Sequence, residues 1–163
     1  MTSEPKIDVR AATAADASEL ARLRFAFRSR HHAAVEAEQD FVARCEPWMR
    51  DRLTRYTGWR AWVAVQRDTG KEALVGTLWL QLVEKLPNPG TEAELHAYIT
   101  SVYIQPELRN SGVGSRFIQA ALAACRDLDV DTVFLWPSAR SRPLYARHGF
   151  AASDDILSQR LRP

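Results

Sequence analysis

The stretch from Val102 to Phe117 constrains the fold more than any other part of this sequence. It contains a β-branched and aromatic segment that ends at Pro106, a polar turn with Gly112 and Gly114, and the start of an apolar helix. Glycines let a backbone approach an anion, the N–H groups of a first helical turn lack intrahelical partners, and the helix dipole favours negative charge. The stretch therefore predicts a strand–turn–helix unit that binds a phosphate group.

Two common phosphate-binding motifs do not fit this turn. A P-loop requires lysine and then serine or threonine after its last glycine, whereas Gly114 is followed by Ser115 and Arg116. A dinucleotide-binding turn requires a third glycine three residues further on, where Phe117 stands. Nucleoside triphosphates and dinucleotides are therefore not the ligands that this turn predicts.

Hydrophobic periodicity and turn residues predict the remaining elements. The expected strands cover residues 6–10, 60–66, 74–83, 94–104, 131–136 and 156–161. A helix capped by Thr13 or Asp16 comes first, and the later helices are expected over residues 38–56, 112–127 and 141–148. Pro47 lies inside the second helix and predicts either a kink or a division into two shorter helices.

This order of elements predicts an α/β fold in a single domain over residues 1–163, since no linker, repeat or low-complexity tract divides the chain. The central strands form an antiparallel meander. A strand–helix–strand crossover after Pro106 makes the strands over 94–104 and 131–136 parallel neighbours. The expected architecture is a mixed sheet with one parallel pair, flanked by helices.

Composition excludes several classes of protein. The net charge is only +2, and the arginines are dispersed along the chain, so we expect no nucleic-acid partner. Cys45 and Cys125 are too few for a disulfide framework, and no Cys/His spacing predicts a metal site. The polar start and the lack of a long apolar run predict a cytoplasmic protein with neither a secretory signal nor a membrane span.

A family resemblance rests on two segments about forty residues apart. Residues 109–114 read Arg-Asn-Ser-Gly-Val-Gly and follow a strand end that reads Val-Tyr-Ile-Gln-Pro. Residues 144–150 read Leu-Tyr-Ala-Arg-His-Gly-Phe. Both resemble signature elements of the GNAT acetyltransferase superfamily, Arg/Gln-x-x-Gly-x-Gly/Ala and Leu-Tyr-x-x-x-Gly-Phe. The expected order of elements from Lys6 to Leu161 also resembles the GNAT fold.

The resemblance implies that acetyl-CoA binds here as a co-substrate. The backbone of the strand end would pair with the pantetheine arm, provided that this strand edge is splayed from its neighbour, and the N–H groups of the turn would hold the pyrophosphate. The guanidinium of Arg109 either adds a phosphate contact or is solvated, and Arg116 lies nearby or on an exposed helix face. The residues implied are Val102, Tyr103, Ile104, Arg109, Asn110, Ser111, Gly112, Val113, Gly114 and Ser115.

The resemblance also implies a general acid. Tyr145 matches the family's tyrosine, whose phenol is protonated at neutral pH and can reprotonate the departing thiolate of CoA. Packing of the ring with the hydroxyl in solvent is the alternative role of this tyrosine. Ser138 and Ser141 stand near a position where the family often has an asparagine that contacts the cofactor. Helix capping is the alternative role for these serines.

The general base is less well defined. Many family members place a Glu or His base on the strand before the turn, at positions that here hold Tyr98 and Thr100. Glu94 and His96 share that strand face unless a bulge interrupts it. Either would act directly or through a water chain, and His96 also has a structural alternative as a hydrogen-bonded residue. A reaction without a dedicated base is the third alternative.

The function implied is N-acetyltransfer from acetyl-CoA to a primary amine by direct attack on the thioester, with a small molecule or a protein N-terminus as acceptor. An acyl-CoA-binding sensor without efficient catalysis is the alternative, because the familiar base is missing. A homodimer is left open. The acceptor would meet residues 25–37, which include His31 and His32, and residues 48–62. The aromatic candidates for its pocket, for which packing is the alternative, are Trp59, Trp62 and Trp79.

Overall fold

The computed structural model describes residues 6–30, 32–33, 35–55, 58–68 and 70–162. Five strands form one sheet in chain order, and only the last two are parallel. The strands are β1 (Lys6–Ala11), β2 (Trp59–Asp68), β3 (Lys71–Glu84), β4 (Leu95–Ile104) and β5 (Val130–Phe134). The predicted antiparallel meander and the parallel pair before and after the crossover are therefore confirmed.

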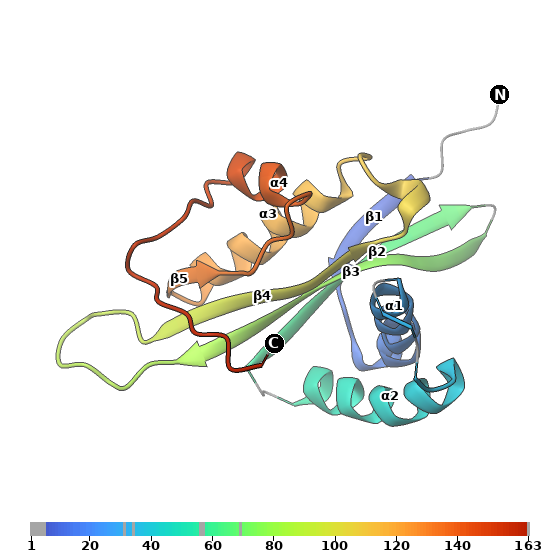
Figure 1. Cartoon of the computed structure of the whole chain (residues 1–163), viewed down its shortest axis with the longest axis horizontal. Coiled ribbons are helices and arrows are strands. Elements are labelled where there is room, and N and C mark those ends of the chain that lie inside the picture. Colours follow the sequence, from blue (N-terminus) through green and yellow to red (C-terminus); the bar gives the residue numbers. More distant parts are fainter. Residues whose placement is uncertain (1–5, 31, 34, 56–57, 69, 163) are drawn as a thin grey trace.

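Helices cover both faces of the sheet, as Figure 1 shows. The two N-terminal helices, α1 (Ala17–Ser29) and α2 (Glu38–Thr54), lie on one face, and α3 (Val113–Asp127) and α4 (Arg142–Arg147) lie on the other. Two short 3₁₀ turns, η1 (Ala14–Asp16) and η2 (Pro106–Leu108), precede α1 and the glycine turn. Because α2 continues through Pro47 as one helix, the division into two shorter helices, one of the two outcomes predicted at Pro47, does not occur.

The period-two pattern of β2 gives each face of the sheet its own core. Val63 and Val65 belong to the cluster under α1 and α2, together with Leu20 and Trp79. Trp62 points the opposite way, into the cluster under α3. This alternation separates Trp62 from Trp59 and Trp79, the two other tryptophans that the sequence offered for an acceptor pocket.

A partly buried ion pair fixes the start of α1. The guanidinium of Arg10 donates two hydrogen bonds of 2.8 Å to the two carboxylate oxygens of Asp16. The backbone N–H of Thr13 donates a third bond of 2.8 Å to the same carboxylate, whose side chain is only 10% exposed. Such a bidentate, charge-assisted contact couples the end of β1 to the first turn of the helix layer.

The C-terminal segment differs from the prediction. The strand expected over residues 156–161 is absent, and residues 150–153 and 156–162 form neither helix nor strand. Ile156, Leu157 and Leu161 are largely exposed. The physical reason lies in their spacing: a strand would place Leu157 and Leu161 on one face and Ile156 on the other, so neither face would gather enough apolar surface to bury. Figure 1 shows this segment running away from α4 as an extended coil.

Candidate active site

The glycine turn presents backbone N–H groups at the start of α3. Asn110 and Gly112 both have positive φ, +63° and +80° respectively, and this left-handed backbone turns the chain from η2 into the helix. Within the described part of the chain, no hydrogen bond uses the N–H groups of Val113, Gly114 or Ser115, and the first helical bond runs from Arg116 to the carbonyl of Gly112. These free donors and the positive helix dipole favour an anion.

The two glycines of the turn serve different physical purposes. A side chain on Gly112 would have no heavy atom within 4 Å, so this glycine is needed for its backbone conformation. A Cβ on Gly114 would lie 3.0 Å from Cδ2 of Leu144, which stands on α4. Gly114 therefore lets α4 approach the start of α3, and the two sequence motifs of the chain meet at this point.

Three arginines gather beside the turn. Arg109 donates a hydrogen bond of 3.2 Å from Nε to the carbonyl of Ile104, which holds its guanidinium against the end of β4. Burial lowers the pKa of Arg109, and repulsion from Arg140 and Arg30 lowers it further. Glu107 offsets this repulsion in part, and the remaining positive charge beside the turn favours an anionic ligand.

The two side chains that follow Gly114 on α3, Ser115 and Arg116, have partners within the protein. The guanidinium of Arg116 donates to the carbonyl of Ile7 on β1, which favours a structural role over a phosphate contact. The hydroxyl of Ser115 lies 3.0 Å from Nε2 of His148, at the end of α4. This pair joins α3 to α4 and leaves the backbone N–H of Ser115 available for a ligand.

A bulge interrupts β4 beside the turn. Thr77 of β3 pairs with Tyr103, whereas Trp79 pairs with Thr100, so two steps along β3 correspond to three along β4. The extra residue coincides with Ser101, whose φ is +53°. The bulge shifts the alternation of side chains, and Val102 therefore leaves the face shared by the residues before it.

The outer edge of β4 is open over its second half. β5 pairs with β4 only from Leu95 to Tyr98, although β4 continues to Ile104. Among the described strands, none pairs with this edge beyond Tyr98. The splayed edge that the pantetheine interpretation requires is therefore present over Val102–Ile104.

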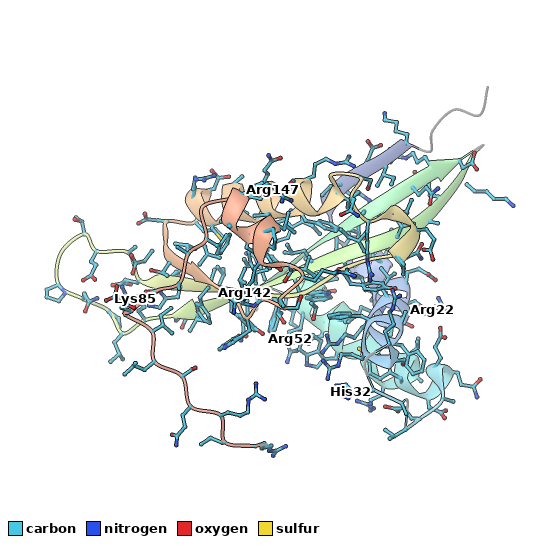
Figure 2. The ribbon with its side chains drawn as sticks, turned by 45° about the horizontal axis from the view of Figure 1, so that its top comes forward. Arg22, His32, Arg52, Lys85, Arg142 and Arg147 are labelled. Atoms are coloured by element: carbon cyan, nitrogen blue, oxygen red, sulfur yellow. The ribbon has the colours of Figure 1, made fainter. Side chains whose placement is uncertain are left out.

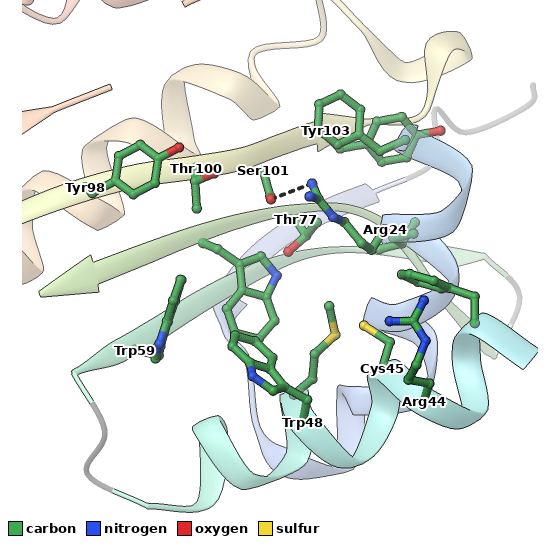
Figure 3. A pocket seen from close by; sticks show the side chains of 15 residues that line it. Arg24, Arg44, Cys45, Trp48, Trp59, Thr77, Tyr98, Thr100, Ser101 and Tyr103 are labelled. Atoms are coloured by element: carbon green, nitrogen blue, oxygen red, sulfur yellow. Dashed lines mark hydrogen bonds between the residues drawn. The ribbon is translucent and has the colours of Figure 1, made fainter. Parts of the chain in front are cut away.

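A cavity of about 510 Å³ opens on the other face of the sheet, between β4, β3 and the two N-terminal helices. Figure 3 shows its lining residues converging from α1, α2, β2, β3 and β4. Tyr98, Thr100, Ser101 and Tyr103 bring the bulge of β4 into its wall. The cavity has the size of a small-molecule site. It extends to the second half of β4, the strand segment whose outer edge is open.

Three tryptophans form one wall of this cavity. Trp48 on α2, Trp59 on β2 and Trp79 on β3 have ring centroids 5.4 to 6.2 Å apart. Trp59 and Trp79 thus line the cavity as expected, whereas Trp62 does not. His32 is exposed and does not belong to the lining, and His31 lies outside the described residues.

Tyr145 lies in the core on the α3 face. Its ring is buried and packs edge-on against Phe150 at a centroid distance of 5.7 Å. Burial raises the pKa of the phenol, so Tyr145 stays protonated at neutral pH. Its position on α4 is anchored next to the glycine turn by the contact of Leu144 with Gly114.

The two base candidates lie outside the cavity lining. Glu94 precedes β4 and is exposed, and its carboxylate accepts a hydrogen bond of 3.3 Å from the N–H of Asn88. His96 lies at the β5-paired end of β4, and its Nδ1 is 3.8 Å from the carboxylate of Asp131. Their catalytic roles stay predictions.

The two serines before α4 bond mainly to each other. Their hydroxyls are 3.0 Å apart, and the N–H of Ser141 bonds to the carbonyl of Ser138 at 3.1 Å. Ser141 occupies the N-cap position, but its hydroxyl makes no bond to the N–H groups of α4. Capping by the side chain is therefore not observed, and the role of this pair in cofactor binding stays a prediction.

Sequence reasoning missed Arg24 and Thr77, which line the cavity. Arg24 follows Leu20 by four residues and precedes Phe27 by three, so helical spacing already placed it on the apolar side of α1. A charge on the apolar side of a helix was the available signal. Thr77 gave no signal, because a threonine in a β-branched strand is ordinary.

No group of three or more His, Cys, Asp or Glu side chains in the described part of the chain has the arrangement of a metal site. No helix of the described residues is long and apolar enough to cross a membrane.

Residues 23–150 match the model of the acetyltransferase (GNAT) family. Because this match spans most of the chain, the chain belongs to the GNAT acetyltransferase family. No curated protein matches the sequence.

Solved structures show the same fold at low sequence identity. A predicted acetyltransferase with acetyl-CoA from Clostridium acetobutylicum is 18% identical at a TM-score of 0.71, covering 96% of this chain and 97% of that one. A GCN5-related N-acetyltransferase from Ralstonia eutropha is 22% identical at a TM-score of 0.69, covering 94% of this chain and 98% of that one. Glucosamine-6-phosphate N-acetyltransferase from Arabidopsis thaliana is 14% identical at a TM-score of 0.69, covering 96% of this chain and 99% of that one. These likenesses establish the fold.

Proposed function

We propose that this chain transfers the acetyl group of acetyl-CoA to a primary amine. The single observation that carries the proposal is the continuity of the site: the free N–H groups of the glycine turn lead directly to the open edge of β4. An extended ligand with a pyrophosphate at one end and amide groups along its length fits such a path. The acetyl-CoA in the related Clostridium structure supports the same donor.

The residues present fit acetyl-CoA in charge and in their free hydrogen-bonding groups. The N–H groups of residues 110–115 would bind the pyrophosphate, with Arg109 and Arg140 supplying positive charge beside it. The backbone of Val102–Ile104 would bind the pantetheine amides, as an added strand binds a sheet edge. When bound, acetyl-CoA supplies the activated acyl group.

Transfer then follows by direct attack. The amine must be neutral to attack, yet at pH 7 only about one lysine-like amine in ~2,500 is deprotonated. A bond forms between the amine nitrogen and the acetyl carbon while the carbon–sulfur bond breaks. The nitrogen gives its proton through water to Glu94 or His96, and Tyr145 gives its phenolic proton to the departing sulfur and regains one from solvent. A buried, protonated Tyr145 is suited to that last step.

Glu94 and His96 retain the role of base only through intervening water, because neither lines the cavity. This observation favours one competing function, an acyl-CoA-binding sensor. No Asp, Glu or His side chain lines the cavity within the described residues, so a bound amine would find no direct base there.

Two measurements separate the alternatives. Calorimetry tests acetyl-CoA binding, and release of the CoA thiol is followed across a panel of primary amines. Binding with turnover supports the transferase, binding without turnover on any amine supports the sensor, and absence of binding would contradict both.

Tyr145→Phe tests the acid. Loss of the phenolic proton is expected to lower kcat about 10²-fold and to leave the Kd for acetyl-CoA within about twofold. Unchanged kcat on every accepted amine would remove Tyr145 from the mechanism.

A further inference from the structure

Arg24 carries a positive charge into the cavity. It lies on α1, points toward β4, and donates a hydrogen bond of 2.9 Å from Nη1 to the hydroxyl of Ser101 at the bulge. Its guanidinium carbon lies 5.8 Å from the centroid of the Phe27 ring. Figure 3 shows the guanidinium beside Ser101 and Thr77 at one end of the cavity.

No carboxylate in the described part of the chain forms an ion pair with Arg24. Its neighbours differ: Arg22 pairs with Glu19, and Arg44, which also lines the cavity, pairs with Glu36. A half-buried cation without a counter-ion is costly, because burial removes hydration that no opposite charge replaces. Burial and repulsion from Arg28 accordingly lower the pKa of Arg24.

Thr77 supplies a second, independent observation. Its residue is 2% exposed, and its hydroxyl is buried without a hydrogen-bond partner among the described residues. Buried polar atoms in native proteins are nearly always hydrogen-bonded, so an orphan hydroxyl in a cavity wall indicates a ligand atom. The hydroxyl can donate to an oxygen acceptor, as can the N–H groups of Arg24 that Ser101 does not use.

The rest of the cavity is aromatic. The three tryptophans described above bound it, and Phe27 and Phe41 add further rings. Trp79 is buried, whereas Trp48 is 41% exposed, so the aromatic wall runs from the floor of the cavity to its mouth. Flat apolar walls at this spacing suit an aromatic or other apolar group.

We infer that the acceptor is a primary amine that bears a carboxylate on the neighbouring carbon and an aromatic or apolar side chain. The carboxylate binds Arg24, Ser101 and Thr77, and the side chain packs against Trp48, Trp59 and Trp79. Because Ser101 both contacts Arg24 and forms the bulge of β4, a carboxylate held there keeps the adjacent amine beside the open strand edge. This inference names the acceptor class and rests on the proposed acetyltransferase function.

The binding test uses ligands that need no acetyl-CoA. Calorimetry compares L-tryptophan, indole-3-propionate, which has the carboxylate but no amine, and tryptamine, which has the amine but no carboxylate. L-tryptophan and indole-3-propionate, which both carry a carboxylate, are expected to bind at least tenfold more tightly than tryptamine. Tryptamine binding as tightly as L-tryptophan would overturn the inference.

Variants locate the carboxylate. Arg24→Gln is expected to weaken indole-3-propionate at least tenfold, whereas Arg22→Gln should leave its Kd unchanged, because Arg22 lies on the outer side of the same helix (Figure 2) and is 48% exposed. Thr77→Val keeps the shape of the side chain and removes only the orphan hydroxyl, so it is expected to fold at least as well as the parent and to weaken the carboxylates several-fold. Unchanged carboxylate binding in both Arg24→Gln and Thr77→Val would refute the site.

Failure of this inference and failure of the proposed function give different results. Carboxylate binding that depends on Arg24, together with no CoA release in the presence of L-tryptophan or any other amine, keeps the anion site and contradicts the transferase. CoA release with tryptamine but not with L-tryptophan keeps the transferase and overturns the acceptor class.

Discussion

Replacing Asp16 with asparagine removes the ion pair that starts α1, the helix that carries Arg24. The carboxylate accepts two bonds from Arg10 and one from the N–H of Thr13, each 2.8 Å long, and a longer bond of 3.3 Å from the hydroxyl of Thr13. An asparagine of the same shape keeps one carbonyl oxygen as acceptor. Its amide group would point N–H donors at the guanidinium, which has only donors of its own.

The magnitude follows from the exposure of the two partners. Removing one partner of a fully buried pair costs about 3–5 kcal/mol. Asp16 is nearly buried, but the Arg10 side chain is 39% exposed and regains water, so the cost is reduced to about 2–3 kcal/mol. For a chain of this size, such a loss lowers Tm by roughly 5–10 °C.

The effect depends on pH with a definite sign. Hydrogen bonds from Arg10, aided by Thr13, hold the pKa of Asp16 below its ordinary value. Because the folded pKa lies below the unfolded value of about 3.9, the unfolded state binds more protons between the two pKa values. The stabilisation is therefore complete above about pH 4 and is lost as the pH falls through the folded pKa.

Urea unfolding of the parent and Asp16→Asn at pH 7, and at several values below pH 4, measures both effects. The difference in unfolding free energy is expected to be largest at pH 7 and to shrink in acid. Glu19→Gln is the matched control, since Glu19 and its partner Arg22 are both about half exposed, and its cost should stay below about 0.5 kcal/mol. An Asp16→Asn cost as small as that of Glu19→Gln, or one independent of pH, would refute the reasoning.

Two further predictions test the packing of the α3 face. A Cβ on Gly76 would lie 2.9 Å from the backbone oxygen of Tyr103, so Gly76→Ala should lower the free energy of unfolding by about 1–3 kcal/mol, measured by thermal unfolding. This loss should exceed that of Gly70→Ala, because a Cβ on Gly70 meets no atom within 4 Å and is opposed only by the positive φ. Burial raises the pKa of Cys125 to about 11, so at pH 8 iodoacetamide should label this thiol rapidly only after unfolding in urea. Mass spectrometry locates the label, and rapid labelling of Cys125 in the native protein would contradict this prediction.

Local patterns in the sequence predicted the scaffold well. The glycine turn, the apolar spacing of α3 and the crossover to β5 are short-range features, and the structure confirms them. The prediction of a strand after α4, over residues 156–161, was wrong, because strand formation depends on a partner edge and on a buried face that short-range patterns do not show. Of the two outcomes predicted at Pro47, a kink or a division, the division does not occur, since surrounding contacts can hold a helix together across the one bond that proline removes.

The candidate site was only partly predictable for the same reason. Glycine conformation and a helix terminus are properties of contiguous residues, so the turn could be read directly. The cavity depends on a side chain from α1, a hydroxyl from β3 and a bulge in β4, which lie 24 to 77 residues apart along the chain. Nothing in the spacing of Arg24, Thr77 and Ser101 indicates that they meet.

The bulge at Ser101 explains how the proposed donor and acceptor sites can lie on opposite sides of one strand. Without the extra residue, β4 would keep strict alternation, and Ser101 and Tyr103 would face away from Tyr98 and Thr100 instead of lining the same cavity. The irregularity also falls just beyond Tyr98, where β5 ends its pairing and the other edge of β4 becomes free. A single strand segment thus faces the glycine turn along its open edge and Arg24 across its surface. That coincidence makes the second half of β4 the expected place of acetyl transfer.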